Sequence, residues 1–515
     1  MGDWDPLLED LAARRAAAKQ GGGERRVRRE HDSGRNTARE RIDALCDPGS
    51  FHELGMLVTT PADDGSEKPS TFICGTAEID GRAVAIGAED FTVLGGGVGS
   101  HLQRYKGGWG GFIEELAYGY GIPLVLLMQG VGGSVAMQES KGYPVLLSGQ
   151  AVFPVFELLD RVPVVAAVLG PTAGSSAARA AISHFSLMTK PNGCLFAGGP
   201  PLVKQATGVD VNKFELGGWE VHTRESGVID NAVDSEDEAF EAIRDFLSYL
   251  PPNITQHPPR GAAEPARLGP ESLLDTLSPN SRRPYDPHRL IDAVADAESF
   301  FEIAPDYGPS LRTGLARIDG YVVGILATDP RSLAGAMDGP SSDKQVRFVE
   351  LCDAFHVPLV YFVDVPGFMI GPEAERSGVL RRGSRALQAI HRATVPVYTV
   401  QLRRSFGLAG QGTGSANRRS LRLAWPTGTW GDLPVTSGIE AEFRAEIEAA
   451  DDPAAKRREI MERFEKQASM WRTVEKFGVE DVIDPRETRE VLARLLALAY
   501  RAPVDYPKHG PQVRP

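Results

Sequence analysis

The chain has 515 residues, of which 42% are apolar and 24% charged, the composition of an ordinary globular protein with room for about two to four domains. Its 56 basic and 69 acidic residues give a net charge of -13, which argues against a general binder of nucleic acid or of membrane surfaces. No apolar stretch approaches the ~18 residues that span a bilayer. The four cysteines include no CxxC pair and the first residues carry no secretory signal, so we expect a cytoplasmic protein.

Short segments of the first half recur in the second half in the same order. Four pairs can be overlaid: 41–53 on 290–302, 75–81 on 314–320, 122–125 on 357–360, and 162–165 on 395–398. The offsets of 249, 239, 235 and 233 residues shrink slowly along the chain. Four matches in register are rarely chance, so the sequence indicates an internal duplication with small loop differences.

Each copy is predicted to contain the same elements. A hairpin comes first, because β-rich runs flank Asp80-Gly81 and Asp319-Gly320. A helix, an apolar strand, a second helix and another apolar strand follow. The first helices are predicted at 111–120 and 344–355, and the apolar strands at 123–128, 162–169, 358–363 and 395–402. Apolar strands alternating with helices indicate parallel strands buried on both faces, that is, an α/β fold.

The duplication predicts two tandem domains, residues 20–250 and 286–502. The segment between them, 251–285, is rich in Pro and Arg and is predicted to be an interdomain linker. Two charged amphipathic helices are expected at 439–476 and 488–500, and residues 503–515 are expected to form a frayed tail.

Glycines and small residues follow the apolar strands in both copies, where open α/β sheets bind ligands. They include Gly132-Gly133 and Gly174-Ser175 in the first copy, and Gly367-Phe368 and Gly407-Leu408-Ala409 in the second. The offset of 233 pairs Gly174 with Gly407. Small residues that open a helix expose backbone N–H groups, which can stabilise an oxyanion such as the enolate of a thioester. The alternative is that these glycines only permit tight turns and close packing.

Other catalytic motifs are mostly absent from the sequence. There is no GxSxG elbow, no HExxH pair and no Gly-Lys dipeptide of a phosphate-binding loop. Gly95-Gly96-Gly97 follows a strand-like run and either contacts a phosphate or forms a flexible connector. Ser175 and Ser176 have no identifiable base partner, so nucleophilic catalysis has little support. The pair Arg403-Arg404 either meets anionic groups or, as is usual for arginine pairs, lies in solvent.

A further set of ordered motifs runs through both halves. It comprises Thr37-Ala38-Arg39-Glu40-Arg41-Ile42, Asp90-Phe91-Thr92-Val93, Glu215-Leu216-Gly217-Gly218, Asp343-Lys344, Val363-Asp364-Val365-Pro366-Gly367-Phe368, Ala424-Trp425-Pro426-Thr427 and Asp481-Val482-Ile483-Asp484-Pro485. With these motifs the chain, from about residue 20 to 502, resembles the carboxyltransferase (β) subunits of biotin-dependent acyl-CoA carboxylases, the propionyl-CoA and acetyl-CoA carboxylase group.

The resemblance implies two tandem crotonase-like domains of the ββα-superhelix type, with acyl-CoA held by the first and biotin by the second. It implies transfer of a carboxyl group from carboxybiotin to the α-carbon of an acyl-CoA through an enolate. The amides of Gly174 and Ser175 would then hold the thioester oxygen, and those of Leu408 and Ala409 the ureido oxygen of biotin. The residues expected to line the substrate sites are Gly132, Gly133, Gly95, Gly96, Gly97, Gly407, Gln411, Gly367 and Phe368.

The resemblance also implies partners. The chain contains no Met-Lys-Met biotin-acceptor sequence and no evident ATP-grasp domain. Biotin is therefore expected on a separate α-subunit that contains biotin carboxylase and biotin carrier, and the chain itself in a hexamer, a trimer of dimers. Because there is no CxxC cluster, neither the zinc-bearing form of the subunit nor any metal is expected.

Several residues depart from the family's motifs, and three of them bear on the substrate sites. Ser175 stands where relatives have glycine, Leu408 adds a bulky side chain where they have none, and Gln411 replaces an acidic residue that helps choose the acyl chain. We therefore expect an acyl group other than plain propionyl. Two alternatives stay open: a decarboxylase or transcarboxylase that acts on a malonyl-type thioester, with or without biotin, and a catalytically silent scaffold subunit.

Overall fold

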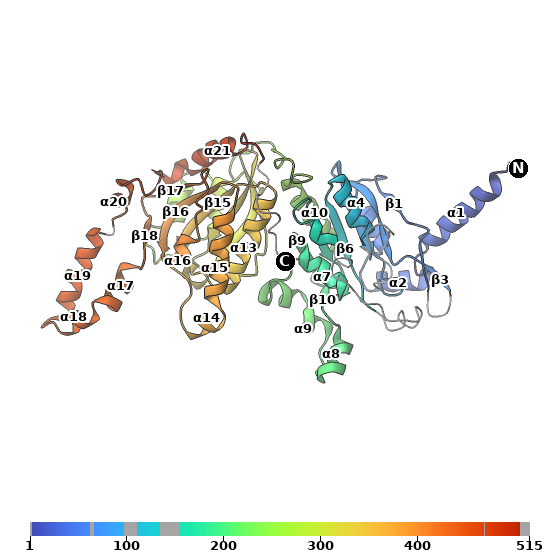
Figure 1. Cartoon of the computed structure of the whole chain (residues 1–515), viewed down its shortest axis with the longest axis horizontal. Coiled ribbons are helices and arrows are strands. Elements are labelled where there is room, and N and C mark those ends of the chain that lie inside the picture. Colours follow the sequence, from blue (N-terminus) through green and yellow to red (C-terminus); the bar gives the residue numbers. More distant parts are fainter. Residues whose placement is uncertain (1–2, 62–65, 97–110, 134–153, 468, 505–515) are drawn as a thin grey trace. The chain divides into compact units, whose positions relative to one another are not determined.

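The computed structural model describes residues 3–61, 66–96, 111–133, 154–467 and 469–504. The chain divides into two compact units, within Met1–Gln256 and His257–Lys508, and each is built on its own sheet (Figure 1). Within the described ranges, no helix is both long enough and apolar enough to cross a membrane.

The first unit is built on a seven-stranded sheet in the order β1-β4-β5-β6-β7-β9-β11. Its strands are β1 His52–Leu54, β4 Phe72–Ile79, β5 Arg82–Glu89, β6 Leu124–Met128, β7 Val164–Val168, β9 Phe185–Thr189 and β11 Asn231–Val233. The first three strands of this order are antiparallel neighbours, and every later pair is parallel. Two small ladders join β2 Thr59–Pro61 to β3 Glu67–Pro69 and β8 Pro171–Ala173 to β10 Cys194–Phe196.

The first unit also contains eight α-helices among its described residues. They are α1 Asp5–Lys19, α2 Glu24–Asp32, α3 Ala38–Leu45, α4 Phe112–Tyr120, α7 Ser175–Ile182, α8 Pro200–Thr207, α9 Lys213–Gly217 and α10 Glu236–Tyr249, with short turns at Pro154–Glu157 and Val221–Glu225. Of these helices, α1 and α8 bury no residue. Residues of α4 and α7, such as Ile113 and Ala180, share one apolar core with buried strand residues such as Leu126. The strands β6 and β7 are buried at every position, as expected for strands covered on both faces.

The second unit contains an eight-stranded sheet in the order β12-β13-β14-β15-β16-β17-β19, with β18 paired to β16. Its strands are β12 Phe301–Glu302, β13 Leu311–Ile318, β14 Tyr321–Thr328, β15 Leu359–Val365, β16 Val397–Phe406, β17 Leu421–Ala424, β18 Thr429–Gly431 and β19 Asp481–Val482. Its helices are α11 Ser272–Thr276, α12 Pro287–Val294, α13 Gly339–Ala354, α14 Pro372–Arg376, α15 Val379–Arg392, α16 Gly407–Gln411, α17 Val435–Glu442, α18 Arg444–Glu448, α19 Pro453–Gln467, α20 Met470–Val474 and α21 Thr488–Ala499, with short turns at Leu333–Gly335 and Pro485–Glu487. In Figure 1, α13 and α15 lie side by side on this sheet.

The two sheets share one register, which confirms the predicted duplication. Ala85 pairs with Leu124 in the first sheet, and Gly324 pairs with Leu359 in the second, at the predicted offsets of 239 and 235. The next strand repeats the relation, because Leu124 pairs with Val164 and Leu359 with Val397.

Both predicted Asp-Gly hairpins are present and are held in the same way. Asp80-Gly81 and Asp319-Gly320 have positive φ angles of 50° and 72°, and of 53° and 75°. The carboxylate of Asp47 accepts the two N–H groups of the first turn at 3.0 and 2.8 Å, and that of Asp296 accepts those of the second at 2.9 and 2.8 Å. An upstream aspartate thus satisfies the N–H groups of each turn, as a turn of this kind requires.

Three segments differ from expectation. The segment 439–476, expected to be one amphipathic helix, is divided among α17, α18, α19 and α20. The stretch 251–285, predicted as a linker, contains α11, and Leu273, Leu277 and Tyr285 are buried in the core of the second unit. Because many Pro and Arg residues surround these apolar residues, the sequence did not indicate that they belong to a core. The strand predicted to end at residue 402 continues as β16 to Phe406, because its last residues still pair with β15 and β18.

Candidate active site

The turns that follow β6 and β8 meet in the first unit, and each contributes a predicted glycine. A Cβ atom on Gly174 would stand 3.6 Å from the Cα atom of Gly132, so the two backbones are in contact. The Ala173 N–H donates to the Gly130 carbonyl at 2.8 Å, which joins the two turns. Gly174 and Gly132 have φ angles of 65° and 77°, which glycine adopts without steric penalty. The structure therefore brings these two predicted residues together, and Gly133 follows in open space.

The first turn of α7 offers backbone donors beside this glycine contact. The Gly174 N–H already donates to the Phe196 carbonyl at 3.3 Å. The Ala178 N–H donates to the Gly174 carbonyl at 3.0 Å, so the N–H groups of Ser175 and Ser176, which come before Ala178, have no acceptor within the helix. The Ser175 Oγ atom is buried and has no hydrogen-bond partner among the described residues. The amide of Ser175 is thus a better donor to an anion here than that of Gly174.

Gly95 and Gly96 pack against the turn after β6. The Val131 N–H donates to the Gly95 carbonyl at 3.1 Å, and a Cβ atom on Gly96 would collide with the Gln129 carbonyl oxygen. Glycine at this position therefore allows a close backbone approach. Gly97 lies outside the described residues, so a phosphate contact by this loop stays a prediction.

Glu89, which the sequence analysis did not single out, lies beneath these turns at the end of β5. Its Oε2 accepts the Gln129 N–H at 2.8 Å, and the Ser176 hydroxyl donates to its Oε1. Burial raises the pKa of Glu89 to about 7, against the opposing effects of the Ser176 hydroxyl, the Arg179 charge and the Gln129 amide. Ser176, predicted to have no base partner, therefore has a carboxyl partner. The sequence signal that could have found it was an acidic residue directly after the buried strand.

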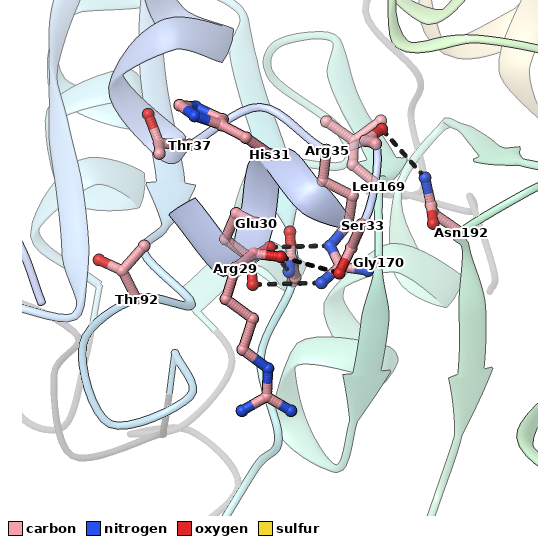
Figure 2. Close-up of polar contacts among 12 residues, drawn as sticks. Arg29, Glu30, His31, Ser33, Arg35, Thr37, Thr92, Leu169, Gly170 and Asn192 are labelled. Carbon is pink, nitrogen blue, oxygen red and sulfur yellow. Dashed lines mark hydrogen bonds and ion pairs between the residues drawn. The ribbon is translucent and has the colours of Figure 1, made fainter. Parts of the chain in front are cut away.

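A buried ion pair supports the same turn from α2. Arg35 donates to the two carboxylate oxygens of Glu30 at 2.8 and 3.1 Å, and Arg29 points away from this pair (Figure 2). Glu30 Oε2 also accepts from Gln129 Nε2 at 2.8 Å, and a Cβ atom on Gly170 would stand 2.6 Å from the amide carbon of Gln129. Burial acts against the ionised form, but the bonds from Arg35 and Gln129 hold the pKa of Glu30 below its usual range.

The second unit repeats the glycine turn at the start of α16. Gly407 has a φ of 60°, close to that of Gly174. Leu408 and Ala409 follow Gly407 in the first turn of α16. Their N–H groups have no acceptor within the helix. The Leu408 side chain is 52% exposed, Ala409 is buried and Gln411 is exposed. The pairing of Gly174 with Gly407 predicted from the sequence is thus matched by a positive φ at both positions.

A buried cluster of charge holds the loops of the second unit. Asp364 Oδ2 accepts from Arg403 Nε and Nη2 at 3.1 and 2.6 Å, and its Oδ1 accepts from Arg404 Nε at 2.7 Å. Asp364 is fully buried and Arg403 is 1% exposed. The interpretation of this arginine pair as solvated surface was wrong, because both side chains neutralise one buried carboxylate at the end of β15. Their role is structural in this position.

The turn after β15 is held by backbone bonds on both sides of Gly367. The Met337 N–H donates to the Gly367 carbonyl at 3.1 Å, and the Met369 N–H donates to the Met337 carbonyl at 2.8 Å. Phe368 packs so closely on Gly383 of α15 that a Cβ atom there would collide with its ring. Gly367 and Phe368 therefore lie in an ordered turn, and their contact with substrate stays a prediction.

The comparisons with known proteins agree with this architecture. Residues 29–512 match the family described as the carboxyl transferase domain. The chain is 35% identical to the propionyl-CoA carboxylase carboxyltransferase subunit of Haloferax mediterranei over 98% of both chains. It is 34% identical to the methylmalonyl-CoA decarboxylase subunit alpha of Veillonella parvula over 95% of both chains. It superposes on the crystal structure of transcarboxylase 12S, described as a hexamer assembly, with a TM-score of 0.88 and 32% identity, covering 99% of this chain and 98% of the other.

The fold is therefore that of two crotonase-like domains in tandem, as the duplication and the superposition both require. The chain belongs to the carboxyl transferase family and is an enzyme that catalyses carboxyl transfer.

Proposed function

We propose that this chain is the carboxyltransferase subunit of a biotin-dependent acyl-CoA carboxylase, with acyl-CoA bound by the first unit and biotin by the second. The observation that carries the proposal is the repeated glycine turn. Gly174 and Gly407 both have a positive φ, of 65° and 60°, at equivalent positions, and each is followed by helix-opening N–H groups. A reaction with an oxyanion on each of two substrates needs two such donor sites.

On the acyl-CoA side, the amides at the start of α7 would hold the thioester oxygen. Removal of the α-proton turns this oxygen into an enolate oxygen, and the positive end of the helix favours that charge. The contact of Gly132 with Gly174 keeps the turn fixed, so the donors need not reorganise as the charge develops. Gly95 and Gly96 pack against the turn after β6, which carries Gly132.

On the biotin side, the residues present fit a ureido oxygen. Leu408 and Ala409 supply N–H groups at the start of α16, and Gly407 supplies the turn that presents them. When bound, biotin supplies the carboxyl group and a ureido nitrogen that can take the α-proton. We propose that it arrives on a separate α-subunit with biotin carboxylase and biotin carrier functions, and that this chain assembles as a hexamer, as its relative transcarboxylase 12S does.

The relatives act on propionyl-CoA or methylmalonyl-CoA by name, which supports a short acyl-CoA as substrate class. Ser175 and Gln411 at the predicted site favour an acyl group that differs from plain propionyl. A cytoplasmic location belongs to the same proposal, supported by four cysteines that are all buried and unpaired.

A second candidate function is decarboxylation of a malonyl-type thioester. The exposed side chain of Leu408, at the donor turn of the second unit, is the observation that favours it, because this bulk would hinder a ring from reaching the amides. A related chain is named as a subunit of a methylmalonyl-CoA decarboxylase.

The test is the reverse half-reaction. Purified chain is given malonyl-, methylmalonyl- and longer carboxyacyl-CoA, with and without free biotin, and the decarboxylated acyl-CoA is followed by mass spectrometry. Loss of the carboxyl group that depends on biotin supports the carboxyltransferase and identifies its acyl chain. Loss without biotin supports the decarboxylase.

A further inference from the structure

Glu89 is the one ionisable group of the first unit that touches both turns of the proposed acyl-CoA site, within the described ranges. It is 2% exposed, and its carboxyl lies under Gly130, whose Cβ, if present, would stand 2.8 Å from Oε2. One oxygen accepts the Gln129 N–H from the turn after β6, and the other contacts the hydroxyl of Ser176 in the first turn of α7. Any change in this carboxyl therefore reaches the donor amides directly.

In the second unit, a neutral side chain holds the corresponding turn. Thr328 ends β14 as Glu89 ends β5, at the offset of 239 found in the hairpins. Its Oγ1 accepts the Asp364 N–H at 3.3 Å, and Asp364 corresponds to Gln129 at the offset of 235. A hydroxyl is thus enough to hold this turn, and the fold itself does not require a carboxyl at the position.

Burial favours the neutral form of Glu89, and the nearby charge of Arg179 opposes it. Arg179 of α7 is the cation that acts on it, but Arg179 Nε also lies 3.2 Å from Oε1 of the buried Glu114 in α4. From α2, Glu30 reaches the same region through Gln129, and its charge is balanced by Arg35. Two carboxylates would therefore share one guanidinium in the core. Burial of the carboxyl outweighs the Arg179 charge and the two hydrogen bonds, and raises the pKa of Glu89 to about 7.

We propose that Glu89 is a positioning residue of the acyl-CoA site and that the site is competent only when this carboxyl is neutral, an inference that rests on the proposed function. An ionised carboxylate against the first turn of α7 would repel an enolate held by the same turn. A neutral carboxyl removes that repulsion and keeps both contacts, because Oε2 still accepts the Gln129 N–H and a hydroxyl on Oε1 can donate to Ser176. The enzyme would thus lose its acyl-CoA chemistry as pH rises past neutrality.

The test compares Glu89→Gln with the unsubstituted chain in the biotin-dependent reverse half-reaction, from pH 5.5 to 9. Glutamine has nearly the same shape, stays neutral, and can accept from Gln129 and donate to Ser176. In the unsubstituted chain, kcat/KM for the carboxyacyl-CoA is expected to fall about tenfold per pH unit above pH ~7. In Glu89→Gln this decline is expected to be absent. Ser176→Ala, which removes a bond that lowers the Glu89 pKa, is expected to move the decline to higher pH.

A second measurement keeps the outcome independent of turnover. Because the folded chain holds a proton on Glu89 that the unfolded chain releases, the melting temperature of Glu89→Gln should rise relative to the unsubstituted chain between pH 4.5 and 7. Two outcomes would overturn the role of Glu89 but leave the proposed function standing. One is a kcat/KM of Glu89→Gln that declines above pH ~7 as in the unsubstituted chain, and the other is a difference in melting temperature between the two chains that does not change with pH. Absence of turnover at every pH overturns the proposed function, and with it the site that Glu89 serves.

Discussion

Gly132 stands so close to Ala173 that a Cβ atom on it would lie 2.9 Å from the Ala173 carbonyl oxygen, one residue before the donor turn of α7. Two turns that are 42 residues apart in sequence are thus in backbone contact, and small displacements of one reach the other. Side chains are excluded from this contact by geometry.

Gly132→Ala is expected to lower kcat/KM for acyl-CoA about 10- to 100-fold, because the clash displaces the turn and the amides that follow it. The positive φ adds strain of about 1–3 kcal/mol, measured as a loss in the free energy of unfolding. Gly119→Ala serves as the control, since this exposed position of α4 is open around the added methyl group and should keep full activity. Equal activity of the two variants would contradict the proposal that the turn at Gly132 positions the amides of the acyl-CoA site.

Gly174→Ala and Gly407→Ala should separate the two substrates. Both positions have positive φ, so both variants carry similar backbone strain. We expect Gly174→Ala to raise KM or lower turnover with respect to acyl-CoA, and Gly407→Ala to do so with respect to free biotin, each by about tenfold or more. Steady-state kinetics with one substrate varied at a time measures this split. The same effect of both variants on both substrates would contradict the proposal that the first unit binds acyl-CoA and the second binds biotin.

Asp364→Asn is expected to destabilise the second unit by about 3–5 kcal/mol, because it leaves the buried guanidinium of Arg403 and that of Arg404 without a counter-charge. The matched substitution Asp319→Asn removes an exposed partner of Arg260 and should cost about 1 kcal/mol or less. Chemical denaturation of the two variants gives both values. A cost for Asp364→Asn no larger than that for Asp319→Asn would show that the buried cluster adds little stability.

Lys344 should give the second unit a pH-dependent stability. Burial lowers the pKa of Lys344 to about 7, although Glu302 opposes the shift, and the ammonium group donates to the carbonyls of Tyr307 and Leu311 at 2.8 and 2.7 Å. Between pH 7 and ~10.5 the unfolded chain holds a proton that the folded chain releases, so stability rises with pH by up to ~1.4 kcal/mol per unit.

Lys344→Met should remove that rise, measured as the slope of the free energy of unfolding against pH. Lys476→Met, at an exposed position of the same unit, should keep it. An unchanged slope in Lys344→Met would mean that the lysine stays charged in the folded chain over this range.

The sequence was sufficient to predict the duplicated architecture because local signals agree with it. Asp80-Gly81 and Asp319-Gly320 specify hairpins by backbone chemistry alone, and buried apolar runs specify the parallel strands. Sequence order also placed Gly174 and Gly407 at equivalent strand ends, where both glycines have a positive φ.

The features that could not be predicted from the sequence depend on contacts between residues that are far apart in the chain. Arg403 and Arg404 meet Asp364 across 39 and 40 residues, and no local pattern distinguishes such a pair from a solvated one. Glu89 and Ser176 are separated by 87 residues, so the acidic residue at the end of a buried strand is visible in the sequence but its contact with the helix N-terminus is not. The apolar residues within 251–285 were masked by the prolines and arginines around them.

The most direct test of the account is whether carboxyl loss from a carboxyacyl-CoA depends on biotin. Purified chain is incubated with methylmalonyl-CoA and its longer analogues, with and without free biotin, and Gly407→Ala is run beside it. The account predicts product only when biotin is present, and much less product from Gly407→Ala. Equal carboxyl loss without biotin, or none from any analogue, would contradict the assignment of this chain to carboxyl transfer between biotin and acyl-CoA.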